Sequence, residues 1–275
     1  MRLLRADPVG SFRLEEFSTG KLPPYAILSH TWGNEEIQYA ANQCRKDGYD
    51  YFWIDTVCID KSNSAELSEA LNSMYKWYQN AEICYAYLSD ELLAPREISF
   101  FSHDWSSLGT RTQLRDELSA ITNIPMDVLS GKGLSKCSLA QRMSWAAHRK
   151  TTRPEDMAYC LMGIFDVNMP LLYGEGGERA FLRLQEEIAK RSYDQSIFAW
   201  RLPHRYAVSG LFAPSPAAFS SSQHIVPCRT QGQATHYSLT NRGLQISSPL
   251  ARHLGNGLYA MLLDCKDQNT EPPYR

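Results

Sequence analysis

Two stretches near the start of the chain carry the residue types best suited to chemistry. Residues 25–33 end with a hydroxyl, an imidazole and an indole at Ser29, His30 and Trp32, and residues 51–60 end with two carboxylates and a thiol. Each stretch begins with β-branched and aromatic residues, which is typical of a buried strand that leads into a loop. In an open α/β sheet, loops at this end of the strands bind ligands.

The first loop is predicted to line a pocket through Ser29, His30, Trp32 and Gly33. The hydroxyl and the imidazole would make polar contacts, and the indole would stack on a planar ring of a ligand. The alternative is structural, because such residues often cap a helix or pack in the core. From these residues alone, both interpretations stay open.

The second loop contributes Asp55, Cys58 and Asp60 to the same predicted site. A cysteine nucleophile would need a lowered thiol pKa and a histidine base, for which His30 is the candidate. Cys58 has apolar neighbours on both sides, which is more typical of a small buried hydrophobic residue. The two aspartates could also contact a magnesium ion, although such sites leave little imprint on a sequence.

Three glutamates are candidate catalytic acids. Glu66 lies three positions after Asn63, which is the spacing of a helix capping box. Glu69 is expected on the exposed face of the same helix. Glu91 follows the third predicted strand closely, so it is expected near the same end of the sheet as the two loops.

Alternating strands and helices are expected to position these loops, whereas residues 1–24 show little pattern. The predicted strands cover residues 25–29, 51–55 and 83–88, and the predicted helices between them cover 34–46 and roughly 63–78. Strands that are separated by single helices favour a parallel sheet with right-handed crossovers. The predicted fold class is therefore α/β, with helices flanking a parallel sheet.

Beyond residue 90 the sequence predicts a helical segment. A helix over residues 110–121 would turn Leu114, Leu118 and Ile121 inward, and Ser138 would cap a further helix.

The next helix is expected over residues 154–162, with Pro154 in its first turn. The glycine-rich residues 174–177 lack the spacing of a nucleotide-binding fingerprint, so they are predicted to be a loop before a last helix.

Short alternating runs after residue 197 predict a small β-rich region. We therefore expect an α/β domain over residues 1–125, a helical extension packed on it over 126–195, and a β-rich accessory region, itself incomplete, over 196–275.

The composition narrows the class of protein. A formal charge of −2 on 275 residues provides no field that would attract nucleic acid. No apolar run reaches the roughly 18 residues that span a bilayer, and the first residues do not form a signal peptide. The seven cysteines show neither zinc-site nor disulfide-framework spacing. We therefore expect a cytoplasmic protein with reduced thiols, without metal, nucleic-acid or membrane-spanning functions.

Together these stretches resemble the fungal heterokaryon incompatibility (HET) domain. Its first block resembles residues 25–33 of this chain, and its second block resembles residues 53–60 and continues to residue 78. The segments at 153–159, 170–175 and 180–185 resemble the region C-terminal to this domain in many fungal members. A match over several blocks is more specific than one short motif.

The third block of the family has the form Arg-Gly-Trp-Thr-x-Gln-Glu-Leu-Leu-Ala-Pro. Residues 91–95 match its second half, but residues 87–90 precede them directly, so the half with the tryptophan is absent. A natural deletion or an error in the gene boundary would each produce this gap.

HET domains resemble TIR domains, which have a flavodoxin-like parallel sheet, and some TIR domains cleave NAD at the nicotinamide–ribose bond. The essential acid of those enzymes is a glutamate in a Trp-x-x-x-Glu-Leu setting. By block position, the resemblance implies that Glu91 is the catalytic acid. It also implies NAD as a substrate of the pocket residues described above, without a bound cofactor.

The resemblance implies an effector of fungal heterokaryon incompatibility, a form of innate immunity that ends in programmed cell death. The alternative is a non-catalytic signalling module that acts by self-association or by binding protein partners. The incomplete third block leaves both functions open. A dehydrogenase is disfavoured because no G-x-G-x-x-G follows the first strand.

Overall fold

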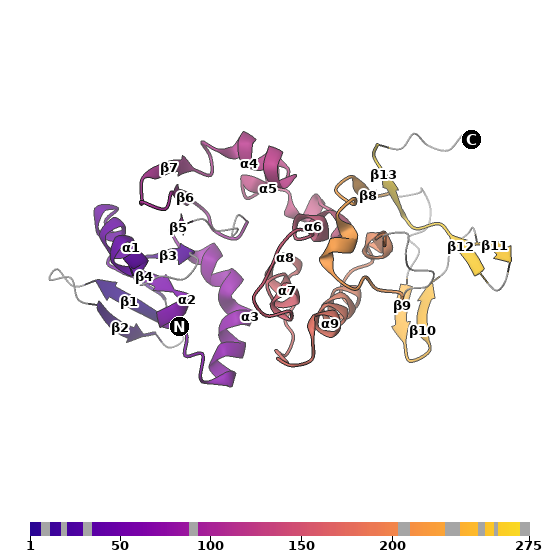
Figure 1. Cartoon of the computed structure of the whole chain (residues 1–275), viewed down its shortest axis with the longest axis horizontal. Helices are drawn as coiled ribbons and strands as arrows, with labels where there is room; N and C mark the ends of the chain where they lie inside the picture. Colours follow the sequence, from indigo (N-terminus) through magenta and orange to yellow (C-terminus); the bar gives the residue numbers. More distant parts are fainter. Residues whose placement is uncertain are drawn as a thin grey trace. The chain divides into compact units, whose positions relative to one another are not determined.

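The computed structural model describes most of the chain, in stretches separated by short gaps. The described residues are 1–6, 12–17, 21–29, 35–87, 93–202, 210–228, 237–246, 251–255 and 258–269. They belong to two compact units, Met1–Lys132 and Gly133–Arg275 (Figure 1). Within these stretches, no helix has the length and apolar character that crossing a bilayer requires.

The described part of the first unit is built on a seven-stranded mixed sheet with the order β2-β1-β4-β3-β5-β6-β7. The central strands β4, β3, β5 and β6 pair in parallel, whereas β1, β2 and β7 pair antiparallel at the edges. The strands are β1 (Arg2–Ala6), β2 (Phe12–Glu16), β3 (Tyr25–Ser29), β4 (Tyr51–Ile54), β5 (Ile83–Tyr87), β6 (Ile98–Phe101) and β7 (Ser107–Thr110).

The helices of this unit connect and cover the strands. They are α1 (Glu35–Lys46), α2 (Asp55–Cys58), α3 (Ser64–Asn80), α4 (Arg115–Thr122) and α5 (Met126–Leu129). The Tyr25 hydroxyl donates to the Trp77 carbonyl at the end of α3, 2.6 Å away, whereas the Tyr85 hydroxyl donates to the Asp47 carboxylate just after α1, 2.7 Å away. Tyr25 and Tyr85 point to opposite faces because side chains alternate along a strand and Leu28 is the register partner of Tyr85. Helices α1 and α3 therefore cover opposite faces of the sheet.

The core of the first unit lies around β3, whose five residues are all buried. Buried runs of this kind are expected in parallel strands, since helices cover both faces. The largest fully buried side chains of this unit are those of Trp53, Tyr25, Tyr85, Phe52, Leu3, Ile27, Leu28, Ile54, Ile98 and Leu129.

The predicted α/β class is confirmed, and the three predicted parallel strands are β3, β4 and β5. The sheet is wider than predicted because β1 and β2 come from residues 1–24, where no element was expected, and β6 and β7 follow residue 95. β1 is short, and charged residues alternate with apolar ones on its partner β2, so its buried face is difficult to recognise before it pairs with β4.

The helix predicted over residues 110–121 is shorter, and its predicted orientation is wrong. Residues up to Thr110 belong to β7, α4 begins at Arg115, and no residue of α4 is buried. Ile121 is 78% exposed, while Leu114 and Leu118 are half-buried. The apolar residues of this segment do recur at helical spacing, but Ile121 packs against no core formed by the described residues.

The start of α3 agrees in part with the predicted capping box. The Asn63 side chain caps the helix by accepting from the backbone N–H groups of Ala65 and Glu66 at 3.1 and 3.3 Å. Glu66, however, accepts from the backbone N–H of Asp60 at 2.9 Å. The reciprocal half of the box is therefore replaced by a bond to the preceding loop.

The second unit begins with short helices and ends with paired strands. Its helices are η1 (Leu134–Lys136), α6 (Leu139–Trp145), α7 (Asp156–Tyr159), α8 (Met162–Phe165), α9 (Gly177–Ala189), η2 (Gln195–Phe198) and η3 (Pro216–Phe219). Its strands are β8 (Ile225–Pro227), β9 (Tyr237–Thr240), β10 (Gly243–Ile246), β11 (Ala251–Gly255), β12 (Leu258–Met261) and β13 (Cys265–Asp267). They form the antiparallel pairs β9–β10, β11–β12 and β8–β13.

Of two helix starts predicted in this unit, one is confirmed and the other is wrong. Ser138 caps α6 in a complete capping box with Gln141, as its residue type suggested. The helix predicted over 154–162 is instead two short helices, α7 and α8, and Pro154 lies outside them. The first of these helices begins at Asp156, directly after Glu155.

The Glu155 carboxylate fills the space that a bound anion would take in the glycine-rich loop. Its Oε1 accepts from the backbone N–H groups of Gly174 and Gly176 at 2.9 and 3.0 Å. Gly174 and Gly176 have positive φ angles of 97° and 86°, which allow both N–H groups to point at one acceptor. The predicted loop is confirmed, and one of the chain's own carboxylates occupies its N–H groups.

Ile27 of β3 is fully buried, whereas Ile121 of α4, which was predicted to face inward, is exposed. We expect Ile27→Ala to lower the free energy of unfolding by about 2–5 kcal/mol, since it leaves a cavity beside a fully buried strand. Ile121→Ala is the matched control and is expected to change it by less than about 0.5 kcal/mol. Urea denaturation followed by tryptophan fluorescence measures both. Similar losses in the two variants would show that α4 is buried after all.

The Glu155 contact predicts a pH-dependent stability of the second unit. Hydrogen bonds from its own backbone N–H and from those of Gly176 and Gly174 lower the pKa of Glu155. A carboxyl with a depressed folded-state pKa stabilises fully above its unfolded pKa of about 4.3 and loses this contribution as pH falls through the folded value.

We therefore expect Glu155→Gln to lower the urea midpoint at pH 7 and to differ less from wild type as pH falls below about 4. Glu178→Gln, at an exposed position of α9, is the matched control and is expected to match wild type at pH 7. A Glu155→Gln midpoint that equals the wild-type value at pH 7 would contradict the assigned role.

Candidate functional site

The C-terminal ends of the three predicted parallel strands lie side by side, as one site shared by the two predicted loops requires. Leu28 is the register partner of Ile54 on β4, and Ser29 is the register partner of Ala86 on β5. In chain order, the four parallel strands are arranged 2-1-3-4, which is the start of a flavodoxin-like order. In such sheets ligands bind at the C-terminal ends of the strands, at the point where the strand order reverses. Here that switch point lies between the C-terminal ends of β3 and β5.

Ser29 is the only predicted residue of the first loop that the described part of the chain includes. It is the last residue of β3 and is 6% exposed. His30, Trp32 and Gly33 lie outside the described residues, as does Glu91. The segment with His30, Trp32 and Gly33 directly follows Ser29, the last residue of β3. The segment with Glu91 follows Tyr87, the last residue of β5.

Asp55 lies at the same rim, as the first residue of α2 directly after β4. Its Oδ2 is 3.2 Å from the Lys61 Nζ, and both side chains are more than one third exposed. Solvent screens such a pair, so its contribution to stability is about 0–1 kcal/mol. The Asp55 carboxylate is therefore open to solvent and to a ligand.

Cys58 belongs to the hydrophobic core and is 3% exposed. Burial raises the pKa of its thiol to about 12, so the thiol stays protonated at neutral pH. A nucleophilic cysteine needs a depressed pKa. This environment supports the interpretation of Cys58 as a small hydrophobic residue, and its role near the rim is to fix α2 against the sheet.

Asp60 organises the turn before α3. Its Oδ1 accepts from the Ser62 hydroxyl at 2.5 Å and from the Ser62 backbone N–H at 2.9 Å. These bonds favour the ionised form and lower the pKa of Asp60. Asp60 is solvent-exposed, and its Oδ1 holds the turn.

Arg2 is a site-supporting residue that the sequence patterns did not indicate. Its guanidinium pairs with the Glu66 carboxylate, and its Nε donates to the Cys58 carbonyl at 3.1 Å. Glu66 also accepts from Asp60, so one cluster joins β1, the loop after β4 and α3. No local signal could identify Arg2, because this contact exists only once β1 lies beside β4.

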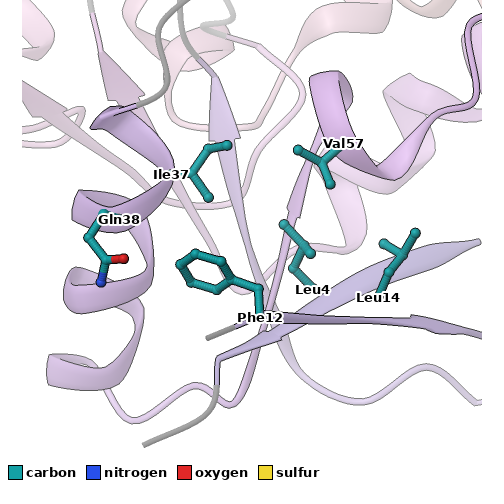
Figure 2. Close-up of a pocket in the computed structure, with 6 residues that line it drawn as sticks. All are labelled: Leu4, Phe12, Leu14, Ile37, Gln38 and Val57. Carbon is teal, nitrogen blue, oxygen red and sulfur yellow. The ribbon is translucent and has the colours of Figure 1, made fainter. Parts of the chain in front are cut away.

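A cavity of about 330 Å³ lies between helices α1 and α2 and strands β1 and β2. Figure 2 shows Ile37 and Gln38 from α1, Val57 from α2, and Leu4, Phe12 and Leu14 from β1 and β2 around it. Among the described residues that line it, Gln38 is the one with a polar side chain. An apolar cavity of this kind does not provide the charged partners that a dinucleotide needs, so we place the candidate site at the switch point.

The described part of the rim can therefore supply acidic and hydroxyl groups at fixed positions. Asp55 and Asp60 are accessible, and Ser29 lies between β4 and β5. No three histidine, cysteine or carboxylate side chains among the described residues gather in a way that could hold a metal ion.

Comparison with known families and proteins agrees with this arrangement. Residues 25–151 match the family described as heterokaryon incompatibility protein (HET), and residues 179–210 match a domain of unknown function, DUF8212. The first match starts at β3 and contains β4, β5 and the rim between them. No solved structure matches the chain.

A curated relative supports the same family. The chain is 42% identical to the vegetative incompatibility protein HET-E-1 of Podospora anserina over 243 residues, which is 69% of this chain and 18% of the relative. The alignment is 243 positions long, which is more than 69% of the 275 residues of this chain. Part of the alignment therefore consists of residues of the relative that have no counterpart in this chain. The resemblance noted in the sequence is thus confirmed: this chain belongs to the heterokaryon incompatibility (HET) family.

Proposed function

We propose that this chain is the effector part of a vegetative incompatibility protein, which triggers programmed cell death by cleaving NAD. The single observation that carries the proposal is the parallel switch point at β3 and β5 within the family match. Both segments that contain the proposed ligand and acid residues start there. The chain spans 18% of the length of its curated relative, so recognition and regulation by other regions are part of the proposal.

The chemistry that the site has to perform is cleavage of the nicotinamide–ribose bond. Such glycosidic cleavage passes through an oxocarbenium-like state, which a nearby carboxylate stabilises. We assign this role to Glu91. Trp32 would stack on a planar ring of NAD, while Ser29, His30, Asp55 and Asp60 would make polar contacts with it.

The proposal places the protein in the cytoplasm and divides it by function. The seven cysteines all lie within the described residues and form no disulfide bond, which suits a reducing compartment that contains NAD. Residues 1–125 would be the effector domain, with a helical extension over 126–195 and an accessory β-rich region over 196–275.

The second candidate function is a non-catalytic signalling module that acts by self-association. The incomplete third block favours it, because the residues that precede Glu91 in the family are missing here. A small misplacement of a catalytic group can cost about a hundredfold in rate. The unmatched part of the alignment with the curated relative agrees with a loss of residues, although it does not locate it.

An NAD cleavage assay distinguishes the two functions. We expect the full chain, concentrated or fused to an oligomerising tag, to release nicotinamide from NAD. Glu91→Gln should reduce the rate by about 10²–10⁴-fold, the usual contribution of a positioned acid or base. Chromatographic quantification of nicotinamide measures both rates.

Glu69→Gln is the matched control, because Glu69 is an exposed glutamate of α3 and is expected to keep the wild-type rate. Absence of nicotinamide release by the clustered wild type would favour the signalling module. Release that Glu91→Gln does not change would assign the acid to another residue, with Asp55, an accessible carboxylate of the rim, next to be tested.

A further inference from the structure

The strand β2 forms one edge of the sheet, and no described strand pairs with its outer side. Figure 1 shows β2 beside β1 at this edge. An exposed strand edge offers unpaired N–H and C=O groups to another strand, so natural proteins cover it, charge it or use it for association. The residues of β2 distinguish between these outcomes.

The hydrogen-bond pattern shows which residues of β2 face outward. Met1 and Phe17 exchange both of their backbone bonds, at 3.0 and 2.8 Å, so they form a hydrogen-bonded pair. Such pairs alternate along an antiparallel ladder. The backbone groups of Arg13 and Glu15 therefore point to β1, whereas those of Leu14 and its second neighbours point outward.

The side chains of β2 are arranged for an apolar contact on one face and a charged contact on the other. Leu14 is 43% exposed and lies opposite Leu4 at the apolar cavity (Figure 2). Arg13 and Glu15 lie on the opposite face, because side chains alternate. Glu15 accepts from the Tyr51 hydroxyl at 3.0 Å, and a carboxylate has room for further donors.

A second copy of β2 fits this edge in one register. If two β2 strands pair antiparallel about a two-fold axis at Leu14, Arg13 of each copy lies opposite Glu15 of the other. These would be non-hydrogen-bonded pairs, in which side chains are closest and opposite charges attract. Shifting the register by two residues in either direction puts Arg13 opposite Arg13 or Glu15 opposite Glu15. The charges thus select the Leu14-centred pairing.

We propose that two copies of this chain associate through β2, so that their sheets join across a two-fold axis at Leu14. The pairing is isologous, as in most homodimers, and uses strand addition. Leu14 of each copy contacts Leu14 of the other beside the apolar cavity. Five residues per strand make a small interface, so the dimer is weak and forms at high local concentration.

This association does not depend on NAD cleavage, and its test contains no NAD. Sedimentation of the full chain over a concentration series should show a monomer–dimer equilibrium. Arg13→Glu and Glu15→Arg should each weaken the dimer about tenfold or more, because each places like charges opposite one another twice. An equimolar mixture of the two variants restores both attractive pairs and should dimerise within about threefold of the wild type.

Two further measurements keep the test decisive if Glu15→Arg is poorly folded after losing Tyr51. Leu14→Lys should abolish the dimer, whereas Leu108→Lys, at an exposed leucine of the opposite edge strand β7, should not. Hydrogen exchange of the Leu14 amide should slow about tenfold between dilute and concentrated protein, while the inward Arg13 amide exchanges equally in both.

Some outcomes overturn the proposal. A wild type that sediments as a monomer up to about 1 mM excludes the dimer. A dimer that survives Leu14→Lys, or a mixture of folded charge variants that stays monomeric, excludes this edge or this register.

Discussion

The parallel pairing of β3 with β4 on one side and β5 on the other is the interaction on which the first unit depends. Every residue of β3 is buried, and its side chains contribute mainly apolar contacts, apart from the Tyr25 hydroxyl, which donates to the Trp77 carbonyl, and Ser29 at the end. Because both neighbours run in the same direction, their C-terminal ends share one rim. Candidate ligand residues from two distant parts of the chain therefore meet without a long loop.

The rim is held from outside the parallel core by the antiparallel strand β1. Arg2 contacts the Cys58 carbonyl and the Glu66 carboxylate, and Glu66 in turn binds the backbone of Asp60. Each of these groups is polar and partly shielded from water, so each is stabilised by having a partner. The cluster explains why Glu66 is a structural residue, and it leaves Asp55 as the accessible acid nearest to β4.

In the second unit, the polar groups of the glycine-rich loop also have partners within the chain. Two N–H groups that could bind an anion receive the Glu155 carboxylate, and Glu175 of the same loop binds Arg183 and the Tyr159 hydroxyl. A segment that resembles a phosphate-binding loop in composition is thus closed by residues of its own chain. The loop follows α8 in the chain, and its contacts with Glu155, Tyr159 and Arg183 link α7 to α9.

The sequence by itself determined the alternation of parallel strands and helices along the chain, the α/β class and the family, because these depend on local periodicity and on motif blocks. It also placed Ser29 and Asp55 at strand ends. Only the tertiary structure decided that residues 1–17 add two strands, that Ile121 faces outward and that Arg2 supports the rim. These features depend on contacts between residues far apart in sequence, and the local pattern of β1 or α4 contains no record of which surface it meets.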